Sequence, residues 1–188
     1  MVHDIFINYF IATASAGAAL IGLLFVSVSI APHRTVQASA PIEARVMSSS
    51  AFTALLNGFF ISLAAIMPHW NIGWVVLIVS LMGITNTLSQ SWLMLRPWPT
   101  WQNVIRRVWL NAVSLGLYLY ELVTALQIIF SPTSDVLIFN LGTLLMYIYA
   151  IALLRAWELL GVQRSGLMSW LNPLYDINAS ELKKKKAQ

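Results

Sequence analysis

Five long apolar runs constrain this chain more than any other feature of its sequence. A helix needs about 20 apolar residues to cross the hydrocarbon core of a bilayer, and these runs, which are bounded by charged residues and prolines, contain 19 to 27 residues each. They are Ile5–Ala31, Val46–Met67, Ile72–Leu95, Val108–Phe130 and Val136–Leu154. Membrane β-strands would instead appear as alternating segments of about ten residues. The runs therefore predict five transmembrane helices.

Composition places the whole chain in the same class. Of its 188 residues, 59% are hydrophobic and 10% are charged, whereas soluble domains carry about 25% charged residues. We expect an all-α, polytopic integral membrane bundle. Its five-helix transmembrane domain would cover residues 1–160, and a cytoplasmic interfacial segment with a basic tail would cover residues 161–188. The lack of cysteine excludes disulfides and thiolate metal sites.

The basic residues predict how the chain is oriented. Short loops rich in Lys and Arg are kept on the cytoplasmic side of the membrane. With five spans, all eleven Lys and Arg residues fall on one side of the membrane. They are Arg34, Arg45, Arg96, Arg106, Arg107, Arg155, Arg164 and Lys183–Lys186. The pattern predicts an amino terminus outside and a carboxyl terminus in the cytoplasm, because one span more or fewer would scatter the arginines.

The inner loops and the small residues carry further expectations. Pro41 is placed to open a cytoplasmic extension of the second helix, and Arg96–Arg107 is typical of a segment lying on the membrane surface. Membrane helices pack closely where small residues recur at four-residue spacing. Such seams comprise Ala14, Ala18 and Gly22 in the first span and Ser50, Ala54, Gly58 and Ser62 in the second. They fit either packing within the chain or an interface between subunits.

The cytoplasmic half of the third span is polar on all sides. Thr85–Ser91 holds six polar residues in seven, and at 100° per residue they cover most of the helix circumference. We expect this half to be surrounded by other helices or to line a cavity open to the cytoplasm. Its polar cluster is Thr85, Asn86, Thr87 and Gln90.

Glu121 is the one acidic residue inside a predicted span. Counting from Phe130 at 1.5 Å per residue puts it about 13 Å below the outer boundary, close to the bilayer middle. The candidates that share its helix face or its depth are Asn111, Ser114, Tyr118, Asn57 and Tyr147. Without a basic partner at this depth, Glu121 is expected to be protonated, hydrogen-bonded to Asn57 or a tyrosine, or exposed to a water- or cation-filled path.

Arg155 is the nearest basic residue to that level within the spans. It lies about 28 Å below the outer start of the fifth span. At the inner interface it could extend to water or pair with Glu158, three residues further on.

The chain carries no motif that indicates catalysis. It lacks HExxH, GxSxG and Walker sequences, and the topology would place His3 and His69 outside and His33 inside. We therefore expect no enzymatic activity, no metal, no cofactor and no nucleic-acid partner. Lys183, Lys184, Lys185 and Lys186 are expected to contact anionic lipid headgroups, at about 1 kcal/mol per lysine near the surface.

The first third of the chain is similar to a known group of proteins. Phe10–Ile30 followed by Ser48–Pro68 resembles the first two helices of small bacterial membrane proteins, some of which are labelled modulators of the FtsH membrane protease. The resemblance implies a multi-pass protein of the bacterial cytoplasmic (inner) membrane, and it carries over no functional residue.

Two functions remain open from the sequence. The first is a non-enzymatic inner-membrane protein that acts through helix packing with itself or with another membrane protein, in an accessory or regulatory role. The alternative is a small oligomeric ion channel or proton-coupled transporter that uses Glu121 and the polar half of the third span. A pore would need a continuous polar path that opens to both faces of the membrane.

Overall fold

The chain folds into five long helices that lie side by side. The computed structural model describes residues 4–30, 42–68, 71–95, 101–132 and 134–159, and in these ranges it contains helices and no strand. The helices are α1 (Asp4–Ile30), α3 (Ile42–Ile66), α4 (Ile72–Leu95), α5 (Trp101–Phe130) and α6 (Asp135–Leu159). Each contains a segment long and apolar enough to cross a membrane. The all-α fold and the five span-length helices are therefore confirmed.

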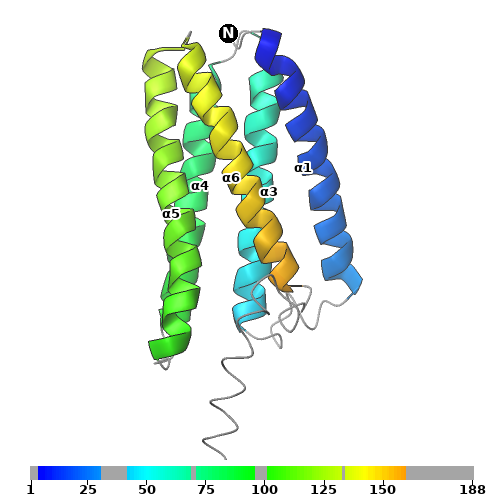
Figure 1. The fold of residues 1–188 in the computed structure, drawn as a ribbon, viewed down its shortest axis with the longest axis vertical. Helices are drawn as coiled ribbons and strands as arrows, with labels where there is room; N and C mark the ends of the chain where they lie inside the picture. The colour runs from blue at the N-terminus through cyan, green and yellow to red at the C-terminus, as the bar shows by residue number, and fades with distance from the viewer. Residues whose placement is uncertain (1–3, 31–41, 69–70, 96–100, 133, 160–188) are drawn as a thin grey trace, which may run out of the picture.

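The helices surround α3, which contacts α1, α4 and α6. α5 packs mainly on α4. α6 begins beside α5 and crosses the bundle obliquely toward α3 and α1 (Figure 1). The short connections from α3 to α4 and from α5 to α6 lie at one end of the bundle, which is the predicted outer end. The opposite end is the predicted inner end.

The helix bounds follow the apolar runs most closely at the predicted outer end. α4 has the predicted bounds, whereas α6 continues five residues past Leu154. α3 begins at Ile42, which agrees with the extension expected after Pro41. The surface segment predicted over Arg96–Arg107 is wrong for residues 101–107, because these continue α5 as helix. Charged residues end an apolar run, but Arg and Glu are good helix formers and do not end a helix.

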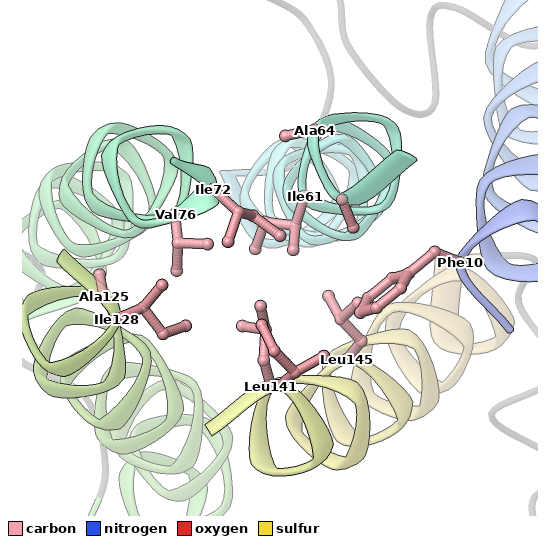
Figure 2. Close-up of a cluster of buried hydrophobic side chains, with 11 residues drawn as sticks. Phe10, Ile61, Ala64, Ile72, Val76, Ala125, Ile128, Leu141 and Leu145 are labelled. Atoms are coloured by element: carbon pink, nitrogen blue, oxygen red, sulfur yellow. The ribbon is translucent and has the colours of Figure 1, made fainter. Parts of the chain in front are cut away.

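Apolar side chains from all five helices close the predicted outer half of the bundle (Figure 2). The cluster consists of Phe10, Ile61, Ala64, Ala65, Ile72, Val76, Ala125, Ile128, Ile138, Leu141 and Leu145. Toward the predicted inner end, a second cluster joins α1, α3 and α6 through Leu24, Ala51, Ala54, Leu55, Leu144, Ile148 and Ala152. Within the described residues, the polar contacts between helices lie mostly below the first cluster.

One of the two predicted small-residue seams packs within the chain. All four members of the α3 seam are buried. In α1 only Ala14 is buried, while Ala18 and Gly22 are exposed, so packing of that seam within the chain is wrong beyond Ala14 and the subunit-interface alternative stays a prediction. The contacting face of α1 instead carries Phe10, Gly17 and Leu24, seven residues apart. Residues four apart drift by about 40° per step, whereas residues seven apart stay close to one line along the helix.

Candidate functional site

Glu121 is held in the middle of the bundle by a residue from another helix. Its side chain is 0% exposed, and so is that of Asn57 on α3. Asn57 Nδ2 donates to both carboxyl oxygens of Glu121, at 2.9 Å to Oε1 and 3.1 Å to Oε2. The hydrogen bond to Asn57, one of the partners expected from the sequence, is therefore present. Among the described residues, Glu121 forms no ion pair.

Helix periodicity explains why Glu121 points inward. The buried positions on its face of α5 follow a spacing of three and four residues, which keeps them on one stripe of the helix. This stripe contains Asn111, Ser114, Tyr118, Glu121, Ala125 and Ile128. Its half toward the predicted inner end is polar and its other half is apolar, so Glu121 lies at the boundary between polar and apolar packing.

The amide of Asn57 can satisfy Glu121 in either protonation state. As oriented, its Nδ2 donates to the carboxyl oxygens, which suits a carboxylate or the oxygen of a carboxylic acid. Asn57 Oδ1 is buried and has no hydrogen-bond partner among the described residues. Rotation of the amide by half a turn would present this oxygen to a protonated carboxyl, which would then donate to it.

The side chain of Arg155 is directed differently from what was expected. Its side chain is 3% exposed, and its Nη2 donates to Asn111 Oδ1 at 3.0 Å and to Ser114 Oγ at 2.9 Å. The expectation that it extends to water is therefore wrong, because two oxygens on α5 lie within reach of its long side chain. Hydrogen bonds from a charged donor are about twice as strong as neutral ones. The two hydrogen bonds from Arg155 connect α6 to α5.

Further hydrogen bonds extend the contact of Arg155 to α4 and α3. Asn111 Nδ2 donates to Ser91 Oγ on α4 at 3.4 Å. The next residue along the chain, Gln90, reaches α3 through Nε2 and Ser49 Oγ at 3.5 Å. We call this set the inner polar network, comprising Ser49, Gln90, Ser91, Asn111, Ser114 and Arg155. It connects four helices on the predicted inner side of Glu121.

The polar half of the third span is partly enclosed. Thr87 and Gln90 are buried, and Asn86 donates to Thr53 on α3. Thr85 and Ser89 are exposed instead, and their hydroxyls donate to carbonyl oxygens of their own helix. Short hydroxyl side chains satisfy themselves in this way, so a polar residue in a span does not require another helix beside it. Asn86, Ser89 and Gln90 also line a cavity of about 600 Å³, whereas the expected opening of such a cavity to the cytoplasm stays a prediction.

The two tyrosine candidates differ in position. The Tyr118 ring is buried against Gly83, where a Cβ atom would come within 2.6 Å of it. The Tyr147 side chain is 59% exposed, so the structure does not bring it to Glu121. It lies in a groove between α5 and α6 with Tyr120 and Asn140. Tyr147 has the depth of Glu121 but points to the outside of the bundle.

Arg155 is the residue of this site that sequence reasoning missed, although a signal was present. α5 and α6 are joined by a short connection, so equal counts from it reach equal depths. Asn111 lies 19 residues before Phe130, and Arg155 lies 20 residues after Asp135. Matching depths across this hairpin would have paired them.

The described residues offer no cluster of three His, Cys, Asp or Glu side chains that could hold a metal ion. Lys183–Lys186, and with them the interfacial segment predicted over 161–188, lie outside the described residues.

Comparisons with known proteins add no family assignment. No family model matches the chain, and neither a curated protein nor a solved structure does.

Proposed function

We propose that the chain is a non-enzymatic, multi-pass protein of the bacterial cytoplasmic membrane that acts by packing against a second copy of itself or another membrane protein. Its amino terminus would lie outside and its carboxyl terminus in the cytoplasm. Five helices of spanning length support insertion, and the basic residues support the orientation. The FtsH-modulator resemblance fits an accessory role of this kind.

The groove between α5 and α6 carries the proposal. It has a volume of about 330 Å³ and is lined by Leu117, Tyr120, Asn140, Thr143, Leu144 and Tyr147. Asn140 lies about 8 Å below the start of α6, and its side chain forms no hydrogen bond with a described residue. An amide that faces hydrocarbon without a partner is unfavourable. A helix from another subunit could supply the missing hydrogen bonds.

The contacts inside the bundle disfavour an ion or proton path through a single chain. The polar side chains around Glu121 are engaged with each other, as in the pair with Asn57 and in the inner polar network. On the predicted outer side of Glu121, the apolar cluster contains residues from every described helix. A channel or proton-coupled transporter would need polar groups through that cluster.

Substitution of Asn140 tests the packing proposal. Asn140→Leu removes the unpaired amide, so it should weaken self-association, or association with a co-purified membrane protein, by about 0.6–2 kcal/mol, a three- to thirtyfold rise in Kd. The protein-only mass of the detergent-solubilised particle, measured across a dilution series, reports this change.

A matched control uses another exposed polar residue within a span. Ser15 on α1 is exposed, but its hydroxyl already donates to Ile11 O. Ser15→Leu should therefore leave the Kd unchanged. A parent protein that stays monomeric at every concentration and captures no membrane partner would contradict the proposal.

Reporters at the two ends test the orientation separately. A reporter fused after Gln188 should be active in the cytoplasm, and a tag placed before Val2 should be accessible from outside. Detection of both ends on the same side would contradict the five-span topology.

A further inference from the structure

A cavity between α1, α3 and α4 has a polar part and an apolar part. Its volume is about 600 Å³, within the usual range for small-molecule sites. α1 contributes only apolar side chains, including Phe25 and Val28. The polar side chains come from α3 and α4, and include Arg45, Ser49 and Gln90. A ligand that fits both parts must itself be amphipathic.

The amide of Gln90 has hydrogen-bonding capacity that the described residues do not use. The side chain is 4% exposed, and its Oε1 atom is buried without a hydrogen-bond partner. Its Nε2 donates a single long hydrogen bond of 3.5 Å to Ser49. A buried amide that is half satisfied is costly. Rotation of the amide by half a turn would let Oε1 accept from the Ser49 hydroxyl and would leave Nε2 to donate to a ligand oxygen in the cavity.

The guanidinium of Arg45 supplies a positive charge to the lining of the same cavity. Arg45 is exposed, and its guanidinium forms no ion pair or hydrogen bond with a described residue. Counting from Ile66 places Arg45 about 32 Å from the predicted outer end of α3, while Gln90 lies about 27 Å along α4. With a hydrocarbon core of about 30 Å, Arg45 lies at headgroup level and Gln90 just inside it.

We propose that this cavity binds a phospholipid with an anionic headgroup. The phosphate would pair with Arg45, Gln90 Nε2 would donate to an ester carbonyl of the glycerol region, and one acyl chain would lie against Phe25 and Val28. The lining also contains exposed apolar residues, such as Phe52 and Leu93, which an acyl chain entering from the bilayer would contact. The inference goes beyond the proposed function and shares with it only the insertion of the helices in a membrane.

Short-range quenching by brominated lipids tests the proposal. The chain has no cysteine, so Met82→Cys introduces a unique fluorophore site at an exposed position of α4. Met82 is four residues before the cavity-lining Asn86 and therefore on the same face of the helix, but it is not part of the lining itself. Leu119→Cys on the exposed face of α5 reports the bulk bilayer. Nanodiscs of phosphatidylcholine would carry increasing fractions of brominated phosphatidylglycerol or brominated phosphatidylcholine.

At Met82→Cys, quenching by phosphatidylglycerol should reach half saturation at a mole fraction about fivefold lower than quenching by phosphatidylcholine, which corresponds to ~1 kcal/mol for one basic residue at an anionic lipid. At Leu119→Cys the two lipids should quench alike. Arg45→Gln should abolish the fivefold preference, whereas Arg107→Gln, which removes the same charge on α5, a helix that does not line the cavity, should retain it. Gln90→Leu should raise the half-saturating fraction about threefold, the average effect of one intramembrane hydrogen bond.

Three results would overturn the proposal. Equal quenching by the two lipids at Met82→Cys would show that no selective site exists. A preference that survives Arg45→Gln would place the phosphate elsewhere. Displacement of the brominated lipid by soluble glycerol phosphate would show an anion site that does not use the apolar part of the cavity.

Discussion

At the scale of single residues, the buried contact between Glu121 and Asn57 joins α5 to α3. Counting along the helices placed Asn57 and Glu121 at one level, and the two side chains meet. The same count placed Tyr147 at that level, but Tyr147 faces outward. Depth comes from the rise per residue, whereas the direction of a side chain depends on how the helix is rotated against its neighbours. A count of depth also did not show that the long side chain of Arg155 reaches α5.

A double-mutant cycle tests whether Glu121 and Asn57 stabilise the bundle. Glu121→Leu and Asn57→Leu each leave a polar partner without its hydrogen bond. The cycle should therefore give a coupling energy of about 0.6 kcal/mol, and at most about 1.7 kcal/mol. The free energy of unfolding in mixed detergent micelles is the quantity to measure.

Glu121→Gln is the matched control in this cycle, because it keeps the volume and can still bond Asn57. It should change the free energy of unfolding by less than either leucine variant. Strict additivity of the two leucine variants would show that the pair contributes nothing to stability.

At the scale of helices, the apolar runs predicted each element, and the small residues predicted only part of the packing. The α3 seam is buried as expected, but α1 turns a different face to the bundle. Gly17, which was not among the predicted seam residues, lies against the Tyr149 hydroxyl of α6. That hydroxyl donates to Thr13 O at 3.0 Å. Composition cannot reveal this contact, because it depends on an aromatic residue distant in the sequence.

Alanine substitutions at Gly17 and Gly22 distinguish the buried face of α1 from its exposed face. A Cβ atom at Gly17 would lie 2.4 Å from the Tyr149 hydroxyl oxygen, so Gly17→Ala should destabilise the bundle by about 1 kcal/mol or more. Gly22 has no atom within 4 Å of such a Cβ, and Gly22→Ala should cause no loss. Thermal unfolding in detergent can compare the two variants.

The tyrosine hydroxyl explains the expected loss, and its removal supplies the control. In a Tyr149→Phe background the next atom is 3.3 Å from the Gly17 Cβ position, so Gly17→Ala should cost much less there. An equal cost in both backgrounds would show that the hydroxyl is not the obstacle.

At the scale of the whole molecule, the sequence predicted the class and the number of spanning helices but not the distribution of polar contacts. Runs of apolar residues determine the number of helices. The inner polar network requires α4, α5 and α6 to present Ser91, Asn111 and Arg155 to one another. The apolar cluster in the predicted outer half of the bundle requires residues from every described helix. Both depend on which helices are neighbours, which a single sequence does not state.

Ion flux tests most directly the central claim that polar residues within the spans hold the helices together and do not form a path. Parent protein and Glu121→Gln would be reconstituted into sealed liposomes with an internal pH reporter and a potassium gradient. We expect both to show the proton and potassium leak of protein-free liposomes, because the apolar cluster closes the bundle beyond Glu121. Flux well above that leak in the parent, lost in Glu121→Gln while the variant stays folded, would contradict the claim.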